Sequence, residues 1–201
     1  MSTAPDMPHL IGVAVALAIA GVSASLYDHR GQRYSRGKTA SLPSARSFAW
    51  VYRYLQLSTL AGAILAFVHP LPWLLIVHRS LPLYYCGMAL AVAATALFVA
   101  AKLDLGEHYS PCFDAYAPRD VMRDGVYRYV RHPIYVANIL LTCGIVLATG
   151  SMLLLVNLVV LSAYYVRAAI REERQLAALH PSYIQYVATT GRFLPRLRLG
   201  R

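Results

Sequence analysis

Charged residues are scarce in this chain of 201 amino acids. Asp, Glu, Lys and Arg together make up 14% of the sequence, against roughly 25% in an ordinary soluble domain. Acidic residues are rarer than basic ones, with 9 Asp and Glu against 19 Lys and Arg. Hydrophobic residues account for 58% of the chain. This composition argues against a soluble globular enzyme and favours a membrane protein.

Cysteine is also rare, and its three occurrences lie far apart. Cys86, Cys112 and Cys143 form no CxxC pair and no cluster with histidine. The spacing therefore predicts neither a disulfide framework nor a zinc site, and we expect no bound metal.

Five apolar segments have about the length that crosses a bilayer as a helix, which takes roughly 20 residues. They are residues 10–27, 48–68, 81–101, 134–149 and 151–166. Gly150 alone separates the last two, which predicts a tight helical hairpin. The sequence thus predicts an all-α polytopic membrane protein with about five transmembrane helices, forming a single integral membrane domain over residues 1–201.

Basic residues mark the expected topology. The formal net charge of +10 would favour nucleic-acid binding if it covered a soluble face. Seventeen of the 19 Lys and Arg residues instead lie in three polar stretches, at 28–47, 102–133 and 167–201. Because Lys and Arg are enriched in cytoplasmic loops, we expect the N-terminus outside, the C-terminus in the cytoplasm and no nucleic-acid partner. The expected location is an inner or plasma membrane, or the endoplasmic reticulum of a eukaryote.

The polar stretch before the fourth span ends in Gly125-Val126-Tyr127-Arg128-Tyr129-Val130-Arg131-His132-Pro133-Ile134-Tyr135. Pro133 suits the first turn of a helix, and the free N–H groups there favour an anionic or carbonyl ligand. Arg131 and His132 could simply cap the helix at the membrane surface. Alternatively, they could belong to a ligand site at the membrane interface.

A second group of polar residues follows the fifth span. If that helix continues into the cytoplasm, Arg167, Arg171 and Arg174 form one basic stripe. Glu172 and Glu173 have no basic residue at the helical spacings that would pair them locally. They are either solvated or matched from elsewhere, by a loop arginine or a cationic ligand.

These features together resemble the isoprenylcysteine carboxyl methyltransferase family and the related integral-membrane phospholipid N-methyltransferases. The resemblance spans residues 106–195, about half the chain. The matching residues are Gly125, Tyr127, Arg131, His132, Pro133, Tyr135, Glu172, Glu173, Leu176, Tyr183, Tyr186, Arg192, Phe193, Leu194 and Pro195. Val126, Ala137 and His180-Pro181 depart from the usual family residues, and the last departure leaves open how the tail closes.

The resemblance implies that S-adenosylmethionine binds at the cytoplasmic face. Residues 1–101 would form the N-terminal spans, and residues 102–201 would form the catalytic half that holds the cofactor. A lipophilic or small acceptor would enter from the bilayer. The implied cofactor-binding residues are Tyr127, Arg131, His132, Pro133, Tyr135, Glu172, Glu173 and Tyr183. Glu172 or Glu173 would hold the methionyl amino group or orient the site, and Arg167 or Arg171 would lie near the acceptor.

The acceptor stays open at this stage. A carboxylate or thiolate fits the arginine stripe and needs no general base. An amine fits the glutamates and needs Glu172, Glu173 or His132 as proton acceptor. Two other functions are alternatives: an NADPH-dependent membrane reductase acting on a lipid or sterol-like substrate, and a non-catalytic lipid-binding or transport subunit.

Overall fold

The computed structural model describes residues 45–68, 80–105 and 121–196. The predicted span at 10–27 lies outside these ranges. Five α-helices and one short 3-10 helix form the described part, and no strand occurs in these three ranges, so the all-α prediction is confirmed there. The elements are α2 (Ala45–Val68), α3 (Leu81–Leu105), η4 (Gly125–Arg128), α4 (Pro133–Thr149), α5 (Met152–Leu179) and α6 (Ser182–Thr189).

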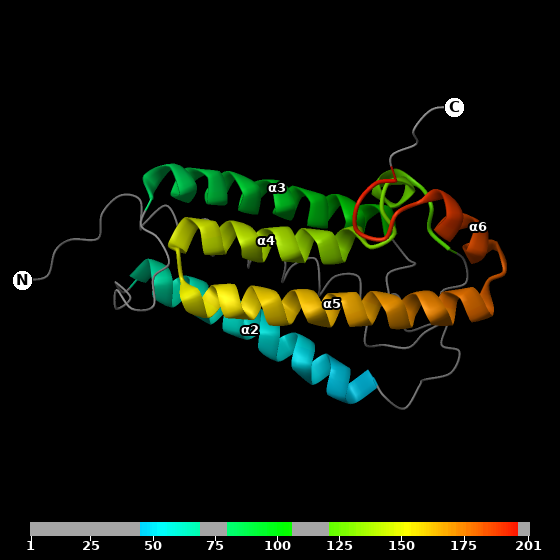
Figure 1. The fold of residues 1–201 in the computed structure, drawn as a ribbon, viewed down its shortest axis with the longest axis horizontal. Coiled ribbons are helices and arrows are strands. Elements are labelled where there is room, and N and C mark those ends of the chain that lie inside the picture. The colour runs from blue at the N-terminus through cyan, green and yellow to red at the C-terminus, as the bar shows by residue number, and fades with distance from the viewer. Residues whose placement is uncertain (1–44, 69–79, 106–120, 197–201) are drawn as a thin grey trace, which may run out of the picture.

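The long helices run alternately up and down the bundle (Figure 1). α4 lies between α3 and α5, and α2 crosses α5 on the side away from α3. Ser151 begins α5 by accepting a hydrogen bond from the Leu154 amide, and Gly150 ends α4 in the left-handed conformation at φ 64°. The predicted hairpin is therefore confirmed, with Gly150 and Ser151 between the two helices rather than Gly150 alone. α6 and η4 lie together at the opposite end of the bundle.

Two described helices, α3 and α5, are long and apolar enough to cross a membrane, while α4 is apolar but has only 17 residues. The five-span topology and its orientation therefore stay predictions. At 1.5 Å per residue, the 28 residues of α5 reach about 42 Å, against about 30 Å for a hydrocarbon core. α5 is therefore longer than a bilayer crossing requires, which agrees with the predicted continuation of this helix past its apolar part.

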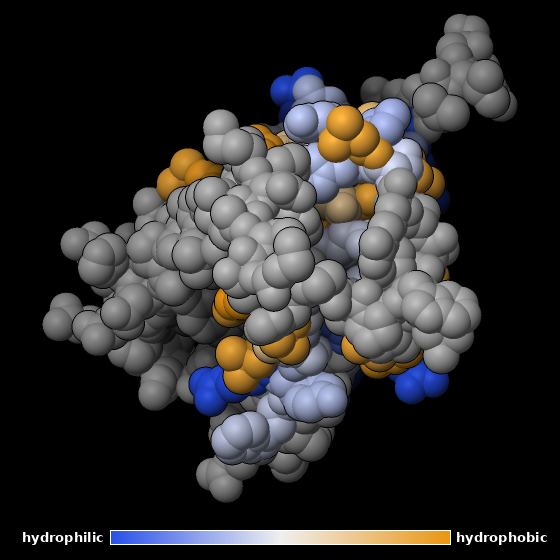
Figure 2. All heavy atoms as spheres, turned by 90° about the vertical axis from the view of Figure 1, so that its left-hand side faces the viewer, coloured by the Kyte–Doolittle hydropathy of each residue, from blue (hydrophilic) through white to orange (hydrophobic). Residues whose placement is uncertain are grey.

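One side of α5 is suited to lipid. Leu153, Val156 and Val160 follow each other at helical spacing and are exposed, and the same stripe becomes basic from Arg167 onward. In the end-on view of Figure 2, hydrophobic side chains reach the surface on several sides of the bundle. Such exposure is costly in water and favourable in a bilayer.

Small residues let α3 and α4 approach closely. A side chain on Gly87 would place its first carbon 2.5 Å from the Ala148 nitrogen, and one on Gly144 would place it 2.7 Å from the Gly87 oxygen. Close backbone approach at glycine and alanine is a usual way for helices to associate in a membrane. α2 is attached differently, because Asn157 of α5 donates to the Thr59 hydroxyl at 2.5 Å and accepts from the Ser58 hydroxyl at 3.3 Å.

Gly144→Leu should separate α3 from α4 and lower stability by about 1–3 kcal/mol or more, because the added atoms meet backbone that cannot rotate away. Val92→Leu, at an exposed position on α3, is the matched control and should change little. Thermal unfolding in detergent, followed by helical circular dichroism, measures both. Equal melting temperatures for Gly144→Leu and the unchanged protein would contradict this packing.

Candidate active site

The site begins with a turn fixed by the end of α3. The Asp104 carboxylate accepts a hydrogen bond from the Val126 amide at 2.8 Å. Gly125 adopts φ +56°, and a side chain there would collide with that carboxylate. Glycine is therefore required at this point, and Asp104 positions η4 against the bundle.

The segment that leads into α4 pairs with the C-terminal tail. The Arg131 amide donates to the Gly191 carbonyl at 2.8 Å, and the His132 amide donates to the Arg192 carbonyl at 3.1 Å. Pro133 then starts α4, where its missing N–H costs nothing. The tail thus closes against the Arg-His-Pro segment despite the departure at His180-Pro181.

Glu173 is the centre of a buried ion cluster. Arg131 donates to its Oε1 from Nε at 3.1 Å and from Nη2 at 2.9 Å. Arg192 donates to Oε1 from Nε at 2.9 Å and to Oε2 from Nη2 at 2.7 Å. His132 Nε2 lies 3.1 Å from Oε1. The partners that α5 itself lacks are therefore supplied by the loop and by the tail.

These contacts decide the charge of Glu173. Burial alone would raise the pKa of its carboxyl group, but hydrogen bonds from His132, Arg192 and Arg131 outweigh burial and hold that pKa well below its usual range. The carboxylate is therefore ionised throughout the neutral range and is a poor proton acceptor. Arg131 also donates from Nη1 to the carbonyls of Val187, at 3.3 Å, and of Thr190.

Glu172 has different surroundings from its neighbour. Its side chain is 42% exposed, whereas that of Glu173 is 10% exposed. The Tyr135 hydroxyl donates to Glu172 Oε2 at 2.8 Å, and His132 Nδ1 lies 3.7 Å from the same oxygen. The His132 and Tyr135 rings stack in parallel with centroids 5.1 Å apart. Glu172 is thus oriented by its partners but still accessible.

Tyrosines form the wall around the two glutamates. Tyr127 and Tyr183 are buried, and burial raises the pKa of both hydroxyl groups well above the ordinary value, so both stay neutral. Tyr186 donates to the Tyr127 carbonyl at 2.5 Å and so ties α6 to η4. Tyr135 stacks on Tyr165 of α5 with centroids 4.8 Å apart.

The structure gathers one predicted set of residues and separates another. The residues proposed from sequence for the cofactor meet at one end of the bundle, around the glutamate pair. Arg167 and Arg171 lie on the exposed side of α5 instead, where they continue its apolar stripe, so their suggested place near an acceptor stays a prediction. The described residues also contain no group of three His, Cys, Asp or Glu that could hold a metal ion.

Some residues of the site have roles that the sequence did not predict. Arg192 entered only through the family resemblance, yet it holds both oxygens of Glu173. The Asp104 carboxylate accepts a hydrogen bond from a backbone amide, and the backbone carbonyl of Thr190 accepts one from Arg131. No sequence motif marks roles of this kind. The sequence did contain one indication of a role for Arg192, because two carboxylates without local partners need more than one cation.

The helical fold and the exposed apolar faces agree with a membrane protein, and the glutamate cluster lies at one end of its bundle. The pattern of the phospholipid methyltransferase family matches residues 82–182, from the start of α3 to the start of α6. That match covers half of the chain, which therefore belongs to this family of membrane methyltransferases. The resemblance stated from the sequence is confirmed at this level.

Part of the chain is also similar to a protein whose name refers to metal resistance. The cobalt-zinc-cadmium resistance protein CzcN of Cupriavidus metallidurans is 37% identical over 82 residues, which are 40% of this chain and 38% of that protein. The chain thus matches well under half the length of CzcN.

Replacing Glu173 with glutamine should destabilise the protein by about 3–5 kcal/mol, because two arginines lose their buried counter-charge. Glu172→Gln, at an accessible position, should cost far less. Since the native pKa of Glu173 is depressed, its contribution is complete above the unfolded pKa of about 4.3 and is lost as pH falls toward the native value.

Melting temperatures at pH 7 and pH 3.5 measure both effects, and the gap between the unchanged protein and Glu173→Gln should narrow at the lower pH. A gap independent of pH, or equal losses for the two glutamates, would contradict the assigned roles.

Proposed function

We propose that this protein transfers a methyl group from S-adenosylmethionine to a lipophilic or small acceptor at the cytoplasmic interface of its membrane. Membership of the phospholipid methyltransferase family supports the reaction. It also favours this reaction over the two alternatives, an NADPH-dependent membrane reductase and a non-catalytic lipid-binding or transport subunit. The different surroundings of the two glutamates, with Glu173 buried in ion pairs and Glu172 accessible, support a site at this end of the bundle.

The observation that carries the proposal is the accessible carboxylate of Glu172. Its described polar partners are the Tyr135 hydroxyl and, more distantly, His132, so no arginine among the described residues neutralises it. The ammonium of a methionyl group would supply the missing counter-charge. Glu173 cannot take that part, because Arg131, Arg192 and His132 already occupy its oxygens.

The surrounding residues fit the rest of such a cofactor. S-adenosylmethionine supplies a methyl group on a positively charged sulfur, and aromatic side chains attract a cation of this kind. We assign Tyr127, His132, Pro133, Tyr135 and Tyr183 to the lining of its site. Arg131 supports this site indirectly, because its hydrogen bonds hold Glu173 and the carbonyl of Thr190 in place.

The residues promote transfer by alignment. Displacement at a methyl group requires the attacking atom, the carbon and the sulfur to lie in line, and it is faster when water is excluded. The His132–Tyr135 stack keeps Glu172 in one orientation, and the tail pairing at Gly191 and Arg192 closes the site from one side. These are positioning roles that need no metal ion.

Arg167 and Arg171 favour a carboxylate or thiolate acceptor. Arg167 follows the apolar stripe of α5, where a lipophilic molecule in the bilayer would present its polar end. An arginine can hold a carboxylate there through two hydrogen bonds. The family description equally suits a lipid amine, and then Glu172 or His132 would accept the proton, since Glu173 is too weak a base.

Calorimetry with S-adenosylhomocysteine on the detergent-purified protein tests the cofactor site. We expect saturable binding that Glu172→Gln and His132→Ala each weaken at least tenfold. The control Arg174→Gln, which removes an exposed charge from the same helix, should bind normally. A folded sample that shows no binding would overturn the assignment, and nicotinamide nucleotides would be titrated next.

The pH dependence of methyl transfer separates a carboxylate acceptor from an acceptor that must first lose a proton. A carboxylate acceptor is already ionised, so its rate should be nearly constant between about pH 6 and 9. An amine must lose a proton, so its rate should rise with pH over the same interval. Transfer of labelled methyl groups to lipid acids, thiols and amines measures these profiles, and Arg167→Ala should reduce transfer only to an acid or a thiol.

A further inference from the structure

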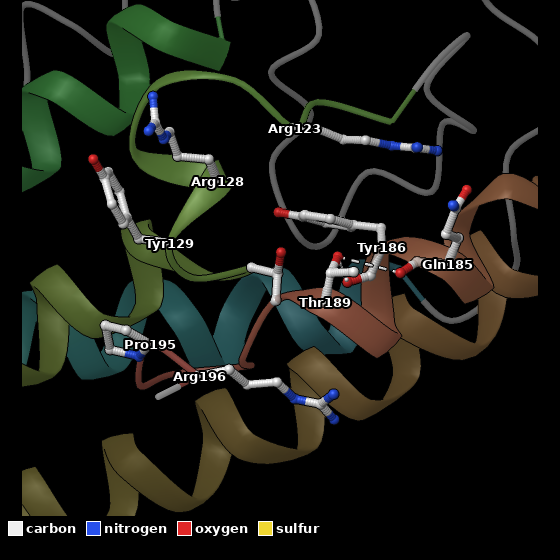
Figure 3. Close-up of a pocket in the computed structure, with 9 residues that line it drawn as sticks. Arg123, Arg128, Tyr129, Gln185, Tyr186, Thr189, Pro195 and Arg196 are labelled. Carbon is white, nitrogen blue, oxygen red and sulfur yellow. Dashed lines mark hydrogen bonds between the residues drawn. The ribbon is translucent and has the colours of Figure 1, made fainter. Parts of the chain in front are cut away.

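A second polar feature lies beside the outer face of α6, apart from the glutamate pair. It is a cavity of about 610 Å³ between the segment around η4, α6 and the tail (Figure 3). None of the residues assigned to the cofactor lines it. Small-molecule sites usually have volumes of about 300–1,000 Å³, so this cavity has the size of a ligand site.

Three arginines surround the cavity, and no carboxylate is among the described residues that line it. Arg123 and Arg128 come from the segment around η4, and Arg196 comes from the tail. Figure 3 shows their guanidinium groups spread around the cavity rather than packed against one another. Gln185 of α6 adds an uncharged hydrogen-bond donor to the same wall, whereas the Thr189 hydroxyl donates to the carbonyls of Gln185 and Tyr186.

Two of these arginines lie against aromatic rings, and Arg196 donates from Nη1 to the Ala188 carbonyl. The Arg123 guanidinium stands 5.9 Å from the centre of the Tyr186 ring, and that of Arg128 stands 5.0 Å from the Tyr129 ring. Within residues 45–68, 80–105 and 121–196, neither arginine forms an ion pair. Stacking orients a guanidinium and leaves its N–H edges available for an anion.

We propose that this cavity is a second binding site that takes a phosphate-bearing ligand. A carboxylate carries one charge and two acceptor oxygens, whereas a phosphate ester carries up to two charges and three acceptor oxygens. Three separated guanidinium groups therefore suit a phosphate or diphosphate. The phosphate could belong to a soluble molecule or to the head group of an anionic lipid.

The cavity and the glutamate cluster share a wall. Tyr186 faces the cavity with its ring and donates its hydroxyl proton to the Tyr127 carbonyl. Thr190 lines the cavity as well, and its carbonyl accepts from Arg131. An occupant would thus contact residues that position the proposed cofactor site, while binding itself through a separate set of arginines.

Calorimetric titration of the detergent-purified full chain with inorganic pyrophosphate at low ionic strength tests the proposal. We expect saturable binding that the double variant Arg123→Ala with Arg128→Ala weakens at least tenfold. The control double variant, Arg53→Ala with Arg174→Ala, removes the same charge at two exposed positions outside the cavity. It should bind pyrophosphate like the unchanged protein.

Competition with short-chain phosphatidylglycerol, kept below its micelle concentration, identifies the source of the phosphate. Displacement of pyrophosphate indicates a lipid head group, and no displacement indicates a soluble ligand. If the double alanine variant has a lowered melting temperature, the double variant Arg123→Lys with Arg128→Lys is used in its place. Loss of the planar guanidinium groups should still weaken pyrophosphate binding several-fold. Absence of saturable pyrophosphate binding, or equal loss in the cavity and control variants, would overturn the proposal.

Discussion

The need to neutralise one buried carboxylate organises the functional end of this protein. Glu173 lies on α5, Arg131 precedes α4 and Arg192 belongs to the tail, so a single cluster joins three separate stretches of the chain. An ionised group away from water is costly unless charges and hydrogen bonds compensate it. The cluster is therefore complete only when the tail closes on the Arg-His-Pro segment, and this closure also sets the position of His132.

Adjacent positions on a helix differ by about 100°, and this difference gives the two glutamates separate roles. Glu173 turns toward the arginines and becomes a fixed part of the structure. Glu172 turns toward the start of α4, where Tyr135 and His132 orient it without neutralising it. A pair of carboxylates in sequence thus becomes one charge that holds the fold and one that is available to a ligand.

Much of the described fold follows from patterns that a sequence displays. The apolar lengths of 81–101 and 151–166 and the single residue Gly150 predicted α3, α5 and the hairpin. For the glutamates the sequence left two alternatives, solvation or a partner from outside the helix, and the structure shows the second for Glu173. The identity of that partner was not predictable, because Arg131 and Arg192 are 61 positions apart and meet only through backbone pairing at Gly191. The cavity beside α6 was missed for the same reason, since its arginines come from separate segments.

The basic residues show why a count of charge is a weak guide to function. Glu173 pairs with Arg131 and Arg192, while Arg167 and Arg171 continue the exposed stripe of α5. Arg123 lines a cavity that has no acid among its described lining residues. All five belong to the same positive excess that the topology rule uses. The predicted topology requires only that these charges lie on one side of the membrane. Their individual positions are therefore free to serve the site, and it is the surroundings of each arginine that distinguish a structural ion pair from a ligand contact.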